Sequence, residues 1–347
     1  MRIQKINAYF KAWETKDCSE LADIMTVKGF GVRTFLKKTF FKLDTLTEEI
    51  KTSNIIKYEI KHIENDNEVY HIKAIASTKK TDYDLELKIT FVHDLISRVY
   101  EANETSDFKR IKCIVTYDGS TYGGYQKQPN QDTIQGTIEN ALHEITGDDI
   151  TIHSSGRTDK GVHAYNQVFH FDTKSKINPE TFYQLLNKYL PDSIQLKSSE
   201  LVQNTFHSRY DVKTKEYVYK INVKEYRLIF RNYEWYPGEF DLDIFTKELE
   251  KIIGTHDFTA FTKTNDLISS ERTIYEASAL VVGDRVKVYI KGNGFLRYMI
   301  RNIIAALISR SSGKADYTID SLLESKDNSI LKDIAPASGL FLNNVEY

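Results

Sequence analysis

The sequence predicts an α+β protein, and three observations carry this prediction. The chain has 347 residues, enough for about two domains of ~100–200 residues each. Near the N-terminus apolar residues recur three or four apart, as in an amphipathic helix, and the period then changes to the alternation typical of strands. After the polar stretch 101–107, the pattern restarts with a strand and mixes helices with strands.

Residues 1–105 are the first predicted domain, small and α+β. A helix is expected over 2–14, because Ile3, Ile6, Tyr9, Phe10 and Trp13 fall on one face. A short helix near 21–25 and a helical stretch within 33–52 follow. Antiparallel strands are then expected at 54–63, 68–79, 84–93 and 95–101.

Residues 108–347 are the second predicted domain, with halves of about 108–235 and 236–347 that face each other. Strands are expected at 109–117, 149–154, 163–172, 194–206, 215–223, 272–282, 285–292 and 339–346. Helices are expected at 134–146, closed by Gly147, at 179–190, near 240 and at 295–310.

Composition excludes several classes of protein. The net charge is −2, so any nucleic acid must be bound by a local basic patch. Cys18 and Cys113 are the two cysteines, too few for a disulfide framework or a four-cysteine metal site. No signal core and no apolar run of about 18 residues appears, so we expect a cytoplasmic protein without a membrane segment.

The most informative stretch is Ser155–Ala164, SGRTDKGVHA. Gly156 and Gly161 permit sharp turns around Arg157 and Asp159, which are expected on a loop between two strands. A carboxylate beside a guanidinium stays ionised at neutral pH and can act as a nucleophile or stabilise positive charge at a sugar carbon. A surface ion pair is the plainer interpretation of this loop taken alone.

The surrounding motifs change that balance. The chain contains YDGSTYGGYQKQ at 117–128, FHSRYDVKTKEYVYKI at 206–221, GTHDFTAF at 254–261, NGFLRYMIRN at 293–302 and APASGLFLNNVEY at 335–347. In this order, and with the Asp159 loop, they resemble the TruA-type tRNA pseudouridine synthases from about residue 109 onward. Tyr125 stands where the family usually has Trp, and Lys215 replaces a common Arg.

The resemblance implies a pseudouridine-synthase fold, with a central antiparallel sheet and a catalytic cleft. It also implies isomerisation of uridine to pseudouridine in tRNA, with the anticodon stem-loop, positions 38–40, as the usual target. Asp159 would attack C1′ or the base, or assist proton loss from the sugar. The target base would be flipped out of its stack. No metal or cofactor is required.

Further site residues follow from the same resemblance. Arg157 would occupy the space that the flipped base leaves, Tyr217 would stack on the uracil, Arg301 would pair with Asp159, and Leu340 would line the pocket. Without the resemblance, the plainer interpretation is favoured for both residues: Tyr217 as a half-buried strand aromatic and Arg301 as a helix-surface arginine. Basic residues among aromatics are candidate phosphate contacts, above all Arg209 and Lys215.

The first domain lies outside the TruA pattern and weakly resembles the SnoaL-like, nuclear-transport-factor-like cone fold. We interpret it as a binding or dimerisation module. The expected partners of the whole chain are tRNA and, as the family implies, a second copy in a homodimer. Two alternatives stay open: a non-catalytic or differently targeted RNA-binding relative, and a cone domain that is itself a small-molecule enzyme.

Overall fold

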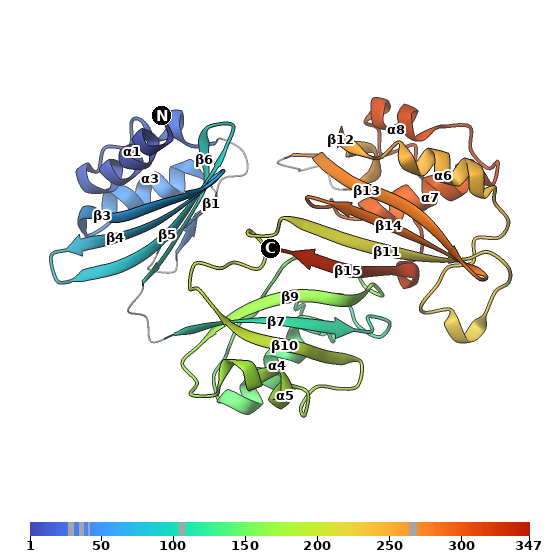
Figure 1. Cartoon of the computed structure of the whole chain (residues 1–347), viewed down its shortest axis with the longest axis horizontal. Coiled ribbons are helices and arrows are strands. Elements are labelled where there is room, and N and C mark those ends of the chain that lie inside the picture. Colours follow the sequence, from blue (N-terminus) through green and yellow to red (C-terminus); the bar gives the residue numbers. More distant parts are fainter. Residues whose placement is uncertain (27–30, 35–37, 41, 104–107, 264–268) are drawn as a thin grey trace. The chain divides into compact units, whose positions relative to one another are not determined.

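The computed structural model describes residues 1–26, 31–34, 38–40, 42–103, 108–263 and 269–347. The chain divides into two compact units (Figure 1). The N-terminal unit comprises residues 1–109 with 202–206, and the C-terminal unit comprises 110–201 with 207–347. The four residues 104–107 of the predicted linker lie outside the described residues.

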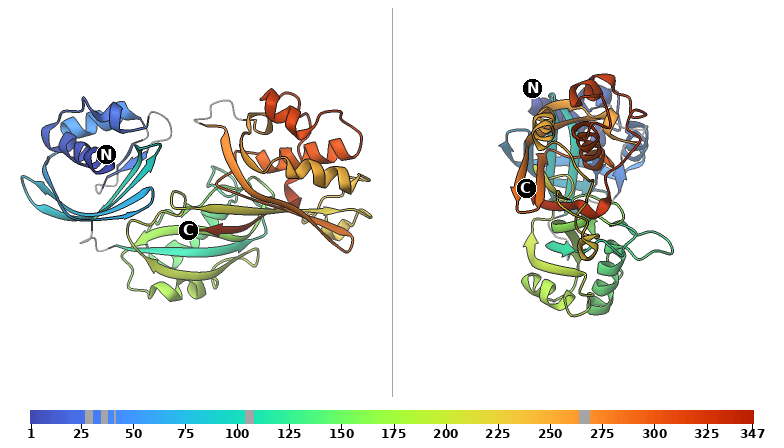
Figure 2. Two further views of the ribbon diagram at one scale, coloured as in Figure 1. Left: turned by 45° about the horizontal axis from the view of Figure 1, so that its top comes forward. Right: turned by 90° about the vertical axis from the view of Figure 1, so that its right-hand side faces the viewer.

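In the N-terminal unit, helices cover one face of a curved sheet (Figure 2). Over the described residues this sheet has six strands in the order β2-β1-β6-β5-β4-β3. The strands are β1 (Gly31–Arg33), β2 (Thr39–Phe40), β3 (Ile55–Asp66), β4 (Val69–Thr78), β5 (Asp82–Val92) and β6 (Leu95–Asn103). The helices are α1 (Arg2–Thr15), α2 (Leu21–Ile24) and α3 (Leu43–Thr52).

Helix α1 confirms the predicted amphipathic pattern, with one exception. Ile6, Tyr9, Phe10 and Trp13 are buried in the core of this unit. Ile3 is 50% exposed, because it lies at the margin of the apolar stripe, in the first turn of the helix. Strands β1 and β2 were not predicted, because they are too short to show an alternating pattern.

The C-terminal unit contains a larger mixed sheet. Over the described residues it has nine strands in the order β10-β7-β9-β15-β11-β14-β13-β12, with β8 paired to β9. The strands are β7 (Lys109–Tyr117), β8 (His153–Ser154), β9 (His163–Thr173), β10 (Ile194–Val202), β11 (Thr214–Asn222), β12 (Gly254–Asp257), β13 (Glu271–Val282), β14 (Arg285–Gly292) and β15 (Leu340–Glu346).

The helices of the C-terminal unit form two groups. They are α4 (Ile134–Thr146), η1 (Pro179–Thr181), α5 (Phe182–Leu186), η2 (Leu228–Phe230), α6 (Leu242–Glu250), η3 (Thr259–Phe261), α7 (Met299–Ser311), α8 (Ile319–Ser325) and η4 (Ala337–Gly339). Residues of α4 and α5 contribute to one apolar core, and residues of α6, α7 and α8 contribute to another. Leu340 belongs to the second core and Leu342 to the first. Because residues two apart on a strand share a face, both cores lie on the same face of the sheet.

Strand β15 joins the two halves into one sheet. It pairs parallel with β9, placing Phe341 beside His163, and antiparallel with β11, placing Leu342 beside Tyr217. The predicted fold class is confirmed, but the expected central antiparallel sheet is mixed at this parallel pair. The start of β9, and the loop that precedes it, therefore lie near the middle of β11, where Val218 pairs with Phe341.

Several expected boundaries were wrong. The strand expected at 149–154 is reduced to His153–Ser154, the helix at 179–190 ends at Leu186, and the helix at 295–310 begins at Met299. The last difference has a local cause. Tyr298 has a left-handed backbone conformation (φ 64°), which does not belong to a right-handed α-helix, so the helix begins only at the next residue. Strand β12 and helix α8 were not predicted.

Candidate active site

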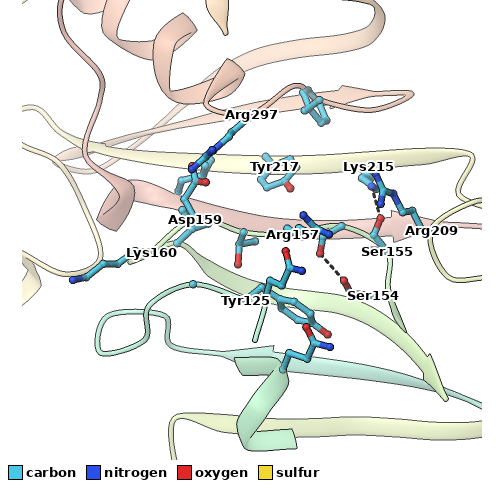
Figure 3. Close-up of a pocket in the computed structure, with 18 of the residues that line it drawn as sticks. Tyr125, Ser154, Ser155, Arg157, Asp159, Lys160, Arg209, Lys215, Tyr217 and Arg297 are labelled. Carbon is cyan, nitrogen blue, oxygen red and sulfur yellow. Dashed lines mark hydrogen bonds between the residues drawn. The ribbon is translucent and has the colours of Figure 1, made fainter. Parts of the chain in front are cut away.

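A cleft of about 1090 Å³ opens over the middle of this sheet, entirely within the C-terminal unit (Figure 3). It is lined by the loop before β9, the start of β11, the start of α7 and Leu340. The volume is slightly above the roughly 300–1,000 Å³ typical of ligand pockets. Every residue that the sequence singled out for the site lines this cleft, namely Arg157, Asp159, Arg209, Lys215, Tyr217, Arg301 and Leu340.

The loop that carries Asp159 turns sharply before it enters β9. Gly161 has a φ of +81°, a backbone conformation that favours glycine over other residues. The amide of Val162 donates to the carbonyl of Asp159 at 3.1 Å and closes the turn. The Tyr117 hydroxyl, at the end of β7, is hydrogen-bonded at 2.8 Å to the hydroxyl of Thr158, the residue before Asp159.

Asp159 faces Arg301 from across the cleft. The distance from Arg301 Nη1 to Asp159 Oδ2 is 3.5 Å, and the Asp159 side chain is 28% exposed. Burial raises the pKa of Asp159 above its ordinary value, while the charges of Arg301 and Arg297 act in the opposite direction. The guanidinium beside the carboxylate is thus Arg301, and the described residues show no ion pair between Asp159 and Arg157.

Arg301 is held firmly where it lies. Its Nε donates to the carbonyl of Ala335 at 2.7 Å, and its guanidinium lies 5.6 Å from the ring centre of Tyr298. The guanidinium of Arg297 lies 4.8 Å from the centre of the same ring. The first turn of α7 and the residues before it therefore direct two cations toward Asp159.

Tyr217 lies between the two apolar cores and packs against both. Its ring meets Phe295 edge-to-face, with ring centres 5.2 Å apart. Burial raises the pKa of Tyr217, and the nearby Asp159 adds to the effect, so the hydroxyl stays neutral at physiological pH. Leu340, with only 6% of its surface exposed, completes an apolar wall beside the carboxylate.

The three remaining basic residues predicted for the site differ in exposure. Arg157 and Arg209 are exposed. Lys215 instead turns inward, and its Nζ donates to the carbonyl of Ser155 at 2.7 Å. Burial lowers the pKa of Lys215 to about 8, with Arg209 and Arg272 adding to the shift.

The sequence did not single out Gln167 or the contact of Tyr117. The Gln167 side chain is fully buried and donates to the Gly156 carbonyl at 2.9 Å. Gln167 directly precedes the apolar residues of its strand, which is only a weak signal, and nothing local indicates that Tyr117 meets Thr158. The local sequence around Arg297 likewise does not indicate that its charge acts on Asp159.

The part of the chain that the structure describes was also considered for a membrane segment and a metal site. No helix in it is both long and apolar enough to cross a membrane. No group of three or more His, Cys, Asp or Glu side chains in it is placed to hold a metal ion.

Comparison with known protein families decides the family. A family model described as tRNA pseudouridine synthase matches residues 113–211 and 249–347. The chain belongs to this family. The matched segments include Asp159, Arg301 and Leu340, while Lys215 and Tyr217 fall between them. The TruA resemblance found in the sequence is confirmed.

Curated relatives carry the same family name. A protein named tRNA pseudouridine synthase A from Brevibacillus brevis is 40% identical over 243 residues, which cover 69% of this chain and 100% of that protein. Those from a Geobacillus species (41% over 246 residues; 69% and 98%) and Bacillus subtilis (38% over 244 residues; 69% and 99%) are similar. The remainder of this chain has no counterpart in these synthases.

Solved structures with an NTF2-like fold resemble a smaller share of the chain. One from Cytophaga hutchinsonii covers 30% of this chain and 90% of its own, at 6% identity and a TM-score of 0.27. A designed NTF2-fold protein covers 29% and 83%, at 14% identity and a TM-score of 0.25. No function follows from likenesses of this size.

Proposed function

We propose that this synthase isomerises uridine to pseudouridine in the anticodon stem-loop of tRNA, with the Asp159 carboxylate acting on a flipped-out uridine. The observation that carries the proposal is the Asp159–Arg301 pair, held at 3.5 Å beside Tyr217 in one cleft. Family membership supports the reaction, and this geometry supports the assignment of residues within it.

The reaction rearranges one nucleotide without adding or removing atoms. The N1–C1′ bond breaks, the uracil turns within the site, and a C5–C1′ bond forms. The proton at C5 is lost, and N1 gains one. Asp159 acts by attack at C1′, by attack on the base or by removing a sugar proton, and each route requires its ionised form. Water does not need to be activated, so an enclosed, partly apolar site suits the reaction.

The neighbours of Asp159 suit this requirement. Arg301 and Arg297 favour the carboxylate electrostatically, although burial opposes them. The net rise in pKa makes the carboxylate more basic than an exposed Asp while leaving it near two fixed cations. Tyr217 supplies a ring for the uracil to stack on, a contact worth about 1–3 kcal/mol that offsets much of the few kcal/mol needed to flip a base.

The RNA contacts are assigned by exposure and charge. Arg157, exposed at the cleft and two residues before Asp159, would fill the space that the flipped uridine leaves in the stem-loop. Arg209, exposed and next to Lys215 in the cleft (Figure 3), would contact phosphate oxygens. Arginine suits both tasks, because its planar guanidinium stacks on bases and binds phosphate in a fork.

The test compares wild type with Asp159→Ala on unmodified tRNA transcripts. Pseudouridine is mapped chemically along the whole RNA. We expect product in the anticodon stem-loop with wild type and none with the variant, while both bind the RNA. If wild type binds tRNA and forms no pseudouridine at any position, the protein is an RNA-binding protein without this activity, and the proposal fails. If pseudouridine forms only outside the anticodon stem-loop, the proposed target region is wrong but the proposed reaction stands.

The homodimer that the family implies is tested separately. Light scattering coupled to size exclusion gives the mass of the free protein, and a mass near twice 40.2 kDa is expected. A mass of one chain at micromolar concentrations would contradict this prediction without affecting the proposed chemistry.

A further inference from the structure

The loop that carries Asp159 is tied down through three of its backbone carbonyls. The carbonyl of Ser155 accepts from Lys215, that of Gly156 accepts from Gln167 at 2.9 Å, and that of Thr158 accepts from the Tyr125 amide at 3.0 Å. Each anchor comes from a different segment of the C-terminal unit. A loop held at three points keeps its carboxylate within the narrow tolerance that catalysis requires.

Among these anchors, Lys215 is the charged one. It lies on β11 two residues before Tyr217, and its ammonium donates to Ser155 at 2.7 Å (Figure 3). A Cβ atom added at Gly156 would lie 3.1 Å from Lys215 Nζ, so the ammonium rests against the loop backbone itself. One strand thus carries both the ring proposed to stack on the uracil and the cation that holds the Asp159 loop.

We infer that Lys215 is a positioning residue, which fixes the Asp159 loop against β11 rather than binding a phosphate of the RNA. The inference rests on the proposed function, since it concerns the same site. Its geometric basis is independent of that function, because the hydrogen bond to Ser155 exists without RNA. Arg209, next to it in the cleft and exposed, is left as the phosphate contact.

The charge of Lys215 changes within the pH range in which activity can be assayed. The pKa of about 8 reflects burial first, then repulsion from Arg209, on the segment before β11, and from Arg272 on β13. The loop packed against the ammonium contributes the neutral carbonyl of Ser155 and the backbone at Gly156. Above this pKa the neutral amine is a weaker donor, so the anchor loosens as pH rises through about 8.

The test pairs Lys215→Met with Lys215→Arg. Methionine has similar length but no donor, whereas arginine keeps the charge and can still donate to a backbone carbonyl. With saturating tRNA, we expect kcat of Lys215→Met to fall by about 10- to 100-fold, as for a misplaced catalytic group, with KM nearly unchanged. Lys215→Arg should restore most of kcat. A phosphate contact would instead raise KM and reduce the salt dependence of binding by about one unit of slope.

The pH profile gives a readout that does not require the methionine variant to fold. Because kcat/KM reports groups of the free enzyme, wild type should lose activity above a pKa near 8. Lys215→Arg should not, because its guanidinium stays charged. Any titration of the RNA affects both enzymes equally. The same alkaline limb in both, or a Lys215→Met defect confined to KM, would overturn the inference. An inactive wild type would instead count against the proposed function.

Discussion

The two units of this chain differ in how their cationic side chains are paired with carboxylates. In the N-terminal unit, Arg2 pairs with Asp94 at 2.6 Å and with Glu68 at 3.0 Å, and Lys38 pairs with Glu49 at 2.8 Å. In the cleft of the C-terminal unit, the described residues give no carboxylate partner within 4.0 Å to Arg157, Arg209 or Arg297. The surface ion pairs of the N-terminal unit contribute little to stability. Because each carboxylate neutralises a cation, these pairs leave no net positive potential that would attract a polyanion such as RNA.

The difference teaches where an RNA would bind on a chain whose net charge is −2. Total charge hides a local excess of cations, because compensated pairs elsewhere cancel in the sum. The cleft combines unpaired arginines, a tyrosine ring and one partly buried carboxylate. If this comparison is right, substitutions in the cleft should affect pseudouridine formation far more than removal of the whole N-terminal region.

The largest effect is expected from Asp159→Asn. The amide has the same shape but cannot act as a nucleophile or base, so product should fall to background in single-turnover assays with excess enzyme. Filter binding should show tRNA affinity within about threefold of wild type, since one neutralised carboxylate changes the electrostatic attraction only modestly. Residual turnover above one per cent of wild type would mean that another group carries the chemistry.

Arg301→Gln comes next, with kcat reduced about 100-fold, as is usual when one preorganised charged donor is lost. The sign of its pH effect is also defined. Asp159 must be ionised, so activity is lost as pH falls through its pKa, and Arg301 lowers that pKa. Removing the cation should therefore move the acid limb of kcat/KM to higher pH. An unmoved limb would show that the pair is not coupled electrostatically.

Tyr217→Ala should reduce kcat/KM by roughly 5- to 150-fold, the equivalent of the 1–3 kcal/mol of a base–aromatic stack. Tyr217→Phe is the matched control, because it keeps the ring and removes only the hydroxyl. We expect the control to retain nearly full activity. Equal losses in both variants would assign the role to the hydroxyl rather than to stacking.

The smallest effect is expected from deleting residues 1–105. Pseudouridine formation should stay within about twofold of the full chain, because an independent domain carries its own core. The synthase from Brevibacillus brevis, matched over its whole length by 69% of this chain, supports this. A deleted protein that folds, by its thermal unfolding, but forms no product would break the comparison between the units.

Much of this arrangement could be predicted from the sequence, and the reason is local. The spacing of its apolar residues predicts helix α4, and Gly147, where φ is 74°, marks its end. The motifs around Asp159 and Arg301 identified the family, and with it their pairing. Long alternating strands such as β4 and β5 were found within a few residues of their bounds.

What escaped prediction depends on contacts between distant segments. Lys215 was predicted to bind phosphate, and its hydrogen bond to Ser155 spans 60 residues, which no local pattern encodes. The same holds for Tyr117 and Thr158, 41 residues apart. Strand β12, four residues long, exists because it pairs with β13, so its own sequence carries too weak a signal.

The position of β15 has a consequence for synthesis on the ribosome. This strand is translated after every other part of the sheet, yet it lies between β9 and β11. A nascent chain that has reached only α7 holds Asp159 and Tyr217 on two pieces with unpaired strand edges, which invite aggregation or chaperone binding. The site proposed for catalysis is therefore completed only late in translation, once β15 has entered the sheet.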